Sequence, residues 1–234
     1  MARPRYASTV VLLRPDEQGS FEILLTRRPP QMRFLGGFYV FPGGTVHKDD
    51  CSPKMLARCR GLSESAAQKI LGNRHDPELA MGHWVAAVRE LFEEVGILLC
   101  ESESGGLIDL RDEAMKKKVE TKRQAVVREA LKFAEFLETE GLYCGLSHMS
   151  YFFHRVTPEF YPMRFDTRFY LALLPAYQTP LARSEEVTHS LWIKPGEALS
   201  QAGPEFPVLP PTTTVLEDLA EIGSWDELLR QYHL

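Results

Sequence analysis

Apolar runs towards both ends of the chain predict β-strands. Residues 6–13 and 21–26 are apolar and rich in strand-forming side chains, and the polar residues 15–20 between them have the composition of a turn. Residues 165–174 and 187–193 have a similar strand-like character. The hydrophobic pattern between these two groups is mostly helical, so we expect a protein that combines a sheet with helices.

The clearest helix signal begins at Asp76. An Asp side chain can cap free backbone amides, and the following Pro77 suits the first turn of a helix. Apolar residues then recur at helical spacing, and Gly96 is typical of a helix end. We therefore predict a helix from Pro77 to about Val95 with one buried stripe, which contains Trp84, Val88, Leu91 and Val95.

Three glutamates lie beside this stripe. Glu90, Glu93 and Glu94 share about one third of the helix circumference. Like charges at this spacing repel one another, so they need either solvent and a neighbour such as Arg89, or a bound cation. Carboxylate oxygens grouped on one rigid element suit Mg²⁺ or Mn²⁺. The helix pattern alone favours the solvent-exposed interpretation.

Two segments look like additions to a smaller core, within one domain that spans residues 1–234. The first, at about 51–81, contains short helical patterns interrupted by glycine. The second, at about 101–147, is rich in Lys, Arg, Glu, Ala and Leu and predicts one or two amphipathic helices. Its lysine run at 116–118 is more typical of a solvated helix face than of a phosphate site.

Composition narrows the classes of function. The chain has 234 residues and a formal net charge of −5, which argues against a general nucleic-acid binder because phosphate backbones favour a basic surface. A small phosphorylated substrate remains compatible with this charge, since its site needs only a few local cations. The sequence has no signal-peptide pattern and no apolar stretch of roughly 18 residues, so we expect a cytoplasmic protein without membrane contact.

A motif upstream of the glutamates changes their interpretation. Gly44, which ends the run Phe-Pro-Gly-Gly, is followed after five residues by Asp50, and Arg89 to Ile97 reads Arg-Glu-Leu-Phe-Glu-Glu-Val-Gly-Ile. This pattern resembles the box of the Nudix hydrolases, in which Gly, five residues, Glu and seven residues precede Arg-Glu-aliphatic-x-Glu-Glu-x-Gly-aliphatic.

Two departures from that box matter. Asp50 occupies the Glu position with a side chain one methylene shorter, which puts the usual supporting contact of that position in question. Residues 51–88 replace the seven-residue spacer. Such an insertion is tolerated if it loops out, because closure entropy grows slowly with length. The subset of the family that this arrangement resembles is the coenzyme A diphosphatases with a split box.

The resemblance implies both a fold and a site. The fold would be the Nudix α/β/α sandwich of the α/β class, with a mixed β-sheet between helices and the two helical insertions added. Glu90, Glu93 and Glu94 would be the catalytic ligands of Mg²⁺ or Mn²⁺, with the Gly44 carbonyl as a further ligand. Arg89 would orient the glutamates. Weaker candidates for the same site are Asp50, Glu185 and Glu186.

The segment before the box resembles the signature of coenzyme A-cleaving Nudix enzymes. Arg28, Arg33, Gly37 and Phe41 fall in register with it, and Pro29 at its Ser/Ala position is the one mismatch. Guanidinium groups suit phosphate oxygens in a fork geometry. The implied partner is a small nucleotide of the coenzyme A class, and the implied reaction yields 3′,5′-ADP and a 4′-phosphopantetheine product. The predicted substrate-binding residues are Arg28, Arg33, Gly43 and Gly44.

Two alternatives stay open. One is a Nudix hydrolase of another nucleoside diphosphate derivative, such as ADP-ribose or a dinucleotide, with which Pro29 is compatible. The other is a catalytically silent Nudix module that binds a ligand or partner. Such modules tend to lose the Glu-x-x-Glu-Glu acids, whereas all three remain here. A homodimer is compatible with each interpretation, because dimerisation is common in such folds.

Overall fold

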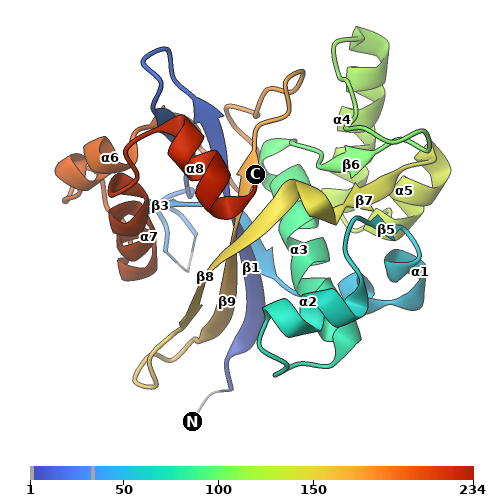
Figure 1. Ribbon diagram of the computed structural model, residues 1–234, viewed down its shortest axis with the longest axis horizontal. Helices are drawn as coiled ribbons and strands as arrows, with labels where there is room; N and C mark the ends of the chain where they lie inside the picture. The colour runs from blue at the N-terminus through green and yellow to red at the C-terminus, as the bar shows by residue number, and fades with distance from the viewer. Residues whose placement is uncertain (1–2, 33–34) are drawn as a thin grey trace.

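A mixed sheet forms the centre of the computed structural model, which describes residues 3–32 and 35–234 (Figure 1). Its strand order is β10-β2-β1-β9-β8, with β3 paired to β2 and β4 paired to β1. β1 and β9 run parallel, and the other pairs are antiparallel. The strands are β1 Arg5–Pro15, β2 Phe21–Arg27, β3 Tyr39–Val40, β4 Gly43–Thr45, β8 Met149–Val156, β9 Phe165–Leu173 and β10 His189–Ile193.

The strands predicted from apolar runs are found at β1, β2 and β9. The centre of β1, from Val10 to Leu13, is fully buried because helices cover the sheet on both faces. The prediction for residues 187–193 was too long, since β10 begins only at His189 and the buried Val187 belongs to the preceding loop. β8 was not predicted.

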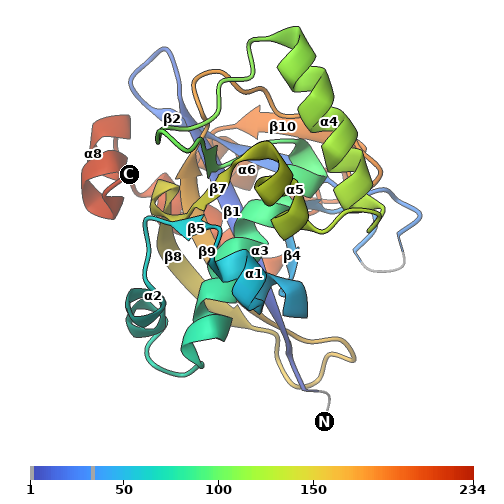
Figure 2. The same cartoon turned by 90° about the vertical axis from the view of Figure 1, so that its right-hand side faces the viewer.

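One face of the sheet is covered by α3 (Pro77–Val95) and by the two inserted segments, which surround α3 on the outside (Figure 2). The inserted segments form short strands as well as the predicted helices, and these strands pair in the order β5-β7-β6. The elements are η1 Lys48–Cys51, α1 Pro53–Leu56, β5 Cys59–Arg60, α2 Glu64–Ile70, β6 Cys100–Glu101, α4 Glu113–Val127, α5 Phe133–Glu140, β7 Tyr143–Gly145 and η2 Leu146–His148.

The opposite face is covered by α6 (Pro195–Gln201), α7 (Pro210–Ala220) and α8 (Trp225–Tyr232) (Figure 1). Apolar side chains fill the two spaces between the sheet and its helical layers, giving one core on each face. The arrangement confirms the predicted α/β/α sandwich with a mixed sheet.

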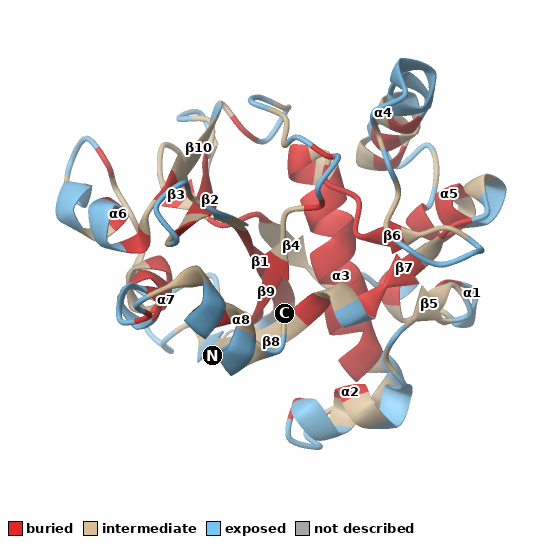
Figure 3. Cartoon of the chain, turned by 45° about the horizontal axis from the view of Figure 1, so that its top comes forward, coloured by how far each residue is buried: buried red, intermediate tan, exposed pale blue. Residues whose placement is uncertain are grey.

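Helix α3 has the predicted bounds, and Gly96 ends it with a left-handed φ of 73°. Two expectations were wrong. Asp76 stands at the N-cap, but its side chain makes no capping hydrogen bond. The helix is also buried on all sides from Ala80 to Phe92, rather than along one stripe, because the inserted segments cover its outer face (Figure 3). The glutamates of α3 therefore do not lie on a solvated face.

Other parts of the chain agree with the surface pattern of the sequence. The lysines at 116–118 are exposed on α4, as predicted for a solvated helix face.

Among the described residues, no helix has both the length and the apolar character needed to cross a bilayer.

Candidate active site

Two glycines let β4 lie close to its neighbours on both sides. Gly43 pairs with Thr9 of β1, and a Cβ at Gly43 would overlap the Ser8 carbonyl oxygen. A Cβ at Gly44 would overlap the carboxylate of Glu90. Only glycine fits both positions without displacing a neighbour.

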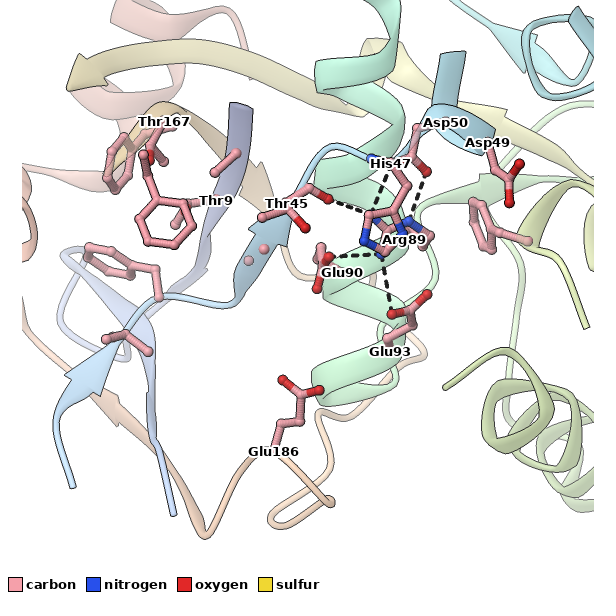
Figure 4. Close-up of a pocket in the computed structure, with 18 of the residues that line it drawn as sticks. Thr9, Thr45, His47, Asp49, Asp50, Arg89, Glu90, Glu93, Thr167 and Glu186 are labelled. Atoms are coloured by element: carbon pink, nitrogen blue, oxygen red, sulfur yellow. Dashed lines mark hydrogen bonds and ion pairs between the residues drawn. The ribbon is translucent and has the colours of Figure 1, made fainter. Parts of the chain in front are cut away.

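Arg89 connects the carboxylates of the site (Figure 4). Its Nε and Nη2 donate to the two oxygens of Asp50 at 2.8 and 2.9 Å, a bidentate geometry. Its Nη1 donates to Glu90 at 2.8 Å and to Glu93 at 3.3 Å. Nη2 also donates to the Thr45 carbonyl oxygen at 2.9 Å. Arg89 is thus hydrogen-bonded to β4, to η1 and to its own helix at once.

Asp50 makes this contact in spite of its short side chain. The turn η1 carries Asp50 to the side of α3, where the residue is buried, and its Oδ2 accepts a hydrogen bond from the His47 amide at 2.8 Å. The supporting contact that the sequence put in question is therefore present, although 39 positions separate Asp50 from Arg89.

Burial raises the pKa of each glutamate in the row. Glu94 is buried and accepts a hydrogen bond from the Gly43 amide at 3.2 Å, but desolvation and repulsion from Glu90 and Glu186 hold its pKa well above the usual value. Desolvation also raises the pKa of Glu93 to about 7, with Arg89 opposing the shift. The pKa of Glu90 is raised by desolvation, again opposed by Arg89. Burial and mutual repulsion therefore disfavour the charged forms of these three carboxylates.

A cleft of about 1160 Å³ opens over the carboxylates. Glu90 and Glu93 line it together with Gly43, Gly44 and Arg28. In the close-up, Thr9 and Thr167 lie on one side of Glu90 and Asp49 lies on the other, so the cleft extends from the sheet across α3 to the inserted segments (Figure 4).

Glu185 and Glu186, which the sequence could not distinguish, have different surroundings in the structure. Glu186 lines the cleft, extends towards Glu90 and Glu93, and raises the pKa of Glu90 and Glu94 through its charge (Figure 4). Glu185 is 67% exposed and lies 3.7 Å from Arg128. Of the pair, only Glu186 faces the α3 carboxylates across the main cleft.

Of the two predicted phosphate-binding arginines, only Arg28 lies among the described residues. Arg28 lines the cleft, and its Nε is buried without a hydrogen-bond partner among the described residues. Its charge acts on Glu94, lowering the pKa that burial raises. Arg33 lies outside the described residues.

The donor set suits a hard divalent cation. In residues 3–32 and 35–234, no three His, Cys, Asp or Glu side chains are grouped closely enough to hold a metal ion; Glu90 and Glu93 face Arg89, and Glu94 faces the Gly43 amide. Carboxylate oxygens are nevertheless the ligands that Mg²⁺ and Mn²⁺ prefer. Positive charge there would offset the desolvation and repulsion that raise the pKa of the three glutamates.

The chain is similar in sequence to two curated proteins. No family model matches the chain. It is 27% identical to nudix hydrolase 7 of Caenorhabditis elegans over 87% of this chain, and 27% identical to acyl-coenzyme A diphosphatase NUDT19 of Xenopus laevis over 79%. The chain spans 57% and 56% of the lengths of these relatives.

A solved structure extends the comparison to the whole fold. The crystal structure of a NUDIX hydrolase from Alicyclobacillus acidocaldarius matches with a TM-score of 0.78 and 29% identity, over 98% of this chain and 97% of that one. In sequence and in fold, the chain is therefore similar to Nudix hydrolases. Its Nudix box is split, and the Arg89–Asp50 pair joins the two halves across the inserted segment.

Several contacts around the Nudix box were not predicted. The Thr45 carbonyl and the His47 amide take part through backbone atoms, which leave no signature in residue type. Arg123 of α4 is buried and donates to the Glu93 carbonyl. The charged residues around it in the sequence did not predict this burial. The loop between β8 and β9 also lines the cleft; two aromatic residues between Pro158 and Pro162 were its only signal.

Proposed function

We propose that this Nudix protein is a metal-dependent diphosphatase that cleaves coenzyme A or acyl-coenzyme A to 3′,5′-ADP and (acyl-)4′-phosphopantetheine. The observation that carries the proposal is the row of Glu90, Glu93 and Glu94 beside the Arg89–Asp50 pair, at a cleft that Arg28 also lines. Carboxylates grouped at a cleft can hold the divalent ions that neutralise diphosphate oxygens.

Each residue of the site has a distinct task in this proposal. Glu90, Glu93 and Glu94 would hold Mg²⁺ or Mn²⁺, with Glu186 the candidate for a further ligand from the loop before β10. The metal would neutralise diphosphate oxygens and lower the pKa of a bound water. Arg89 positions Glu90 and Glu93 through the hydrogen bonds from its Nη1.

In this proposal, Arg28 and the two glycines of β4 contribute to substrate binding. The Arg28 guanidinium can donate to phosphate oxygens in the cleft, because its Nε has no acceptor among the described residues. Gly44 keeps β4 free of a side chain that would overlap the Glu90 carboxylate, and Gly43 keeps β4 close to β1. The name of the Xenopus laevis relative, an acyl-coenzyme A diphosphatase, agrees with this substrate class. Arg33 is proposed as a second phosphate ligand on the sequence motif alone.

Hydrolysis of a substrate panel tests the proposal. The purified protein is incubated with Mg²⁺ or Mn²⁺ and coenzyme A, acyl-coenzyme A, ADP-ribose, diadenosine compounds or nucleoside triphosphates, and products are identified by mass spectrometry. We expect 3′,5′-ADP from coenzyme A and its thioesters. The Glu93→Gln/Glu94→Gln variant should lose this activity, whereas Glu185→Gln, at a residue that is 67% exposed, should keep it.

A second readout separates chemistry from binding. Mn²⁺ should raise the melting temperature of the native protein, because a ligand that binds only the folded state stabilises it. The increase should be absent in Glu93→Gln/Glu94→Gln. Turnover of a different panel member would contradict the coenzyme A assignment alone. Absence of both turnover and the Mn²⁺ effect would favour a silent ligand-binding module.

A further inference from the structure

Large apolar side chains gather in the loop between β8 and β9. Phe160 is 80% exposed, Tyr161 is 46% exposed and Met163 is 39% exposed. The rings of Phe160 and Tyr161 lie 4.6 Å apart between centroids. Half of the exposed large hydrophobic residues in the described part of the chain therefore belong to one short loop, a concentration that marks a binding surface.

This loop belongs to the cleft of the candidate active site. Phe160, Tyr161 and Met163 all line the same cavity as Glu90. The other exposed hydrophobic residues, Ile70, Met115 and Tyr177, do not line it. Pro158 and Pro162 restrict the backbone of the loop, which lowers the entropy lost when the loop holds a ligand.

Charged side chains line both sides of the cleft. On the side of the inserted segments, the exposed Lys48, Lys54 and Lys132 line the cavity, and Lys54 and Lys132 pair with Glu138 and Asp49 at 2.9 and 3.0 Å. On the side of β9, the lining includes Arg155 of β8 and continues into the β8–β9 loop. In the described part of the chain, the exposed large apolar side chains that line the cleft are those of this loop.

We propose that Phe160, Tyr161 and Met163 form a subsite for the acyl chain of an acyl-coenzyme A substrate. The inference rests on the proposed function and adds to it a preference for long apolar acyl groups. Each methylene of the chain leaves water when it contacts these side chains, so the preference should grow with chain length.

The test compares substrates rather than absolute rates. kcat/KM is measured for free, acetyl-, octanoyl- and lauroyl-coenzyme A with the native protein and with Phe160→Ser/Tyr161→Ser/Met163→Ser. For the native protein, we expect kcat/KM to rise along the series. In the variant, the ratio of kcat/KM for lauroyl-coenzyme A to kcat/KM for free coenzyme A should fall roughly tenfold. Cleavage of free coenzyme A should stay within about twofold in the variant, because the phosphate contacts are untouched.

The matched control changes exposed hydrophobic residues that do not line the cleft. Ile70→Ser/Tyr177→Ser should keep the native chain-length preference. The subsite is overturned if the loop variant keeps that preference, or if it loses free and acylated coenzyme A equally. It is also overturned if gel filtration shows a native dimer that the loop variant dissociates, or if vesicle co-sedimentation depends on the loop, since the apolar surface would then serve a second copy or a lipid surface.

Calorimetry keeps this test separate from the test of the proposed function. Octanoyl-coenzyme A and coenzyme A are titrated into Glu93→Gln/Glu94→Gln, with and without the loop substitutions. Tighter binding of the octanoyl form that requires the loop supports the subsite even if the diphosphatase reaction is not found. Equal affinity for the two ligands overturns the subsite, whatever the outcome of the hydrolysis panel.

Discussion

At the scale of single residues, Arg89 determines whether the carboxylates of α3 can be buried. It is the cation that Asp50, Glu90 and Glu93 share, and its side chain is only 6% exposed. Such an arginine differs from a surface ion pair, because its loss leaves several carboxylates desolvated without a counter-charge.

Arg89→Met should therefore lower the free energy of unfolding at pH 7 by about 3–5 kcal/mol. The loss should become smaller at lower pH, since protonation of the unpaired carboxylates removes their mutual repulsion. The free energy of unfolding of Arg89→Lys should lie between those of the native protein and Arg89→Met, because lysine keeps the charge but loses the bidentate fork. Urea denaturation at several pH values measures these differences. Arg128→Met, at a residue that is 66% exposed, is the control; an equal loss there would contradict the argument.

At the scale of elements, α4 holds the end of α3. Arg123, which is 7% exposed, donates through Nη1 to the Glu93 carbonyl, one of the carbonyls in the last turn of α3. Its Nε and Nη2 donate to Glu120 at 2.8 Å each. A cation at the C-terminal end of a helix also interacts favourably with the helix dipole. The inserted segment therefore contributes directly to the placement of the Nudix carboxylates.

Arg123→Met should lower the free energy of unfolding by roughly 1.5–3 kcal/mol, the value of a hydrogen bond from a charged donor. Hydrogen exchange of the amides in the last turn of α3 should also become faster, because that turn loses its contact with α4. Lys116→Met removes a charge from the exposed face of the same helix and should change neither quantity. Unchanged exchange in Arg123→Met would show that α4 does not hold the helix end.

At the scale of the whole molecule, a histidine between the layers couples stability to pH. His83 of α3 is fully buried against β1, where its Nδ1 lies 3.1 Å from Ser8 Oγ. Burial first, and then the charges of Arg168 on β9, His75 before α3 and His154 on β8, lower its pKa from 6.5 to about 3. Folded His83 therefore stays neutral where an unfolded histidine takes up a proton.

The sign of the effect follows from the two pKa values of His83. Above pH 6.5 both states are neutral and the residue leaves stability independent of pH. As the pH falls from 6.5 towards 3, only the unfolded state binds the proton, so stability is lost by at most about 1.4 kcal/mol per pH unit.

The decrease in unfolding free energy between pH 7 and pH 5 should be smaller in His83→Gln than in the native protein by about 2 kcal/mol. Urea denaturation at the two pH values measures it. His189→Gln, at an exposed histidine, should keep the native decrease. An unchanged pH dependence in His83→Gln would refute the assignment.

The sequence by itself determined the features whose signals lie within a few residues. Helix α3 begins at Pro77 and ends before Gly96 because the proline, the glycine and the apolar spacing act locally. β1, β2 and β9 follow apolar runs in the same way. The three glutamates were identified because most of the Nudix box is one continuous run, which the insertion leaves intact.

Only the tertiary structure decided the surroundings of those residues. The inserted segments cover the outer face of α3, and Glu90 and Glu94 are buried beside Gly44 and Gly43 of β4, although a helix pattern places them beside a solvated face. Asp50 reaches Arg89 because η1 returns the chain to the helix, and Glu186 faces the carboxylates while its neighbour Glu185 faces Arg128. Burial, ion pairing and the direction of a loop side chain arise from contacts between segments far apart in the chain, and no local pattern of residues encodes such contacts.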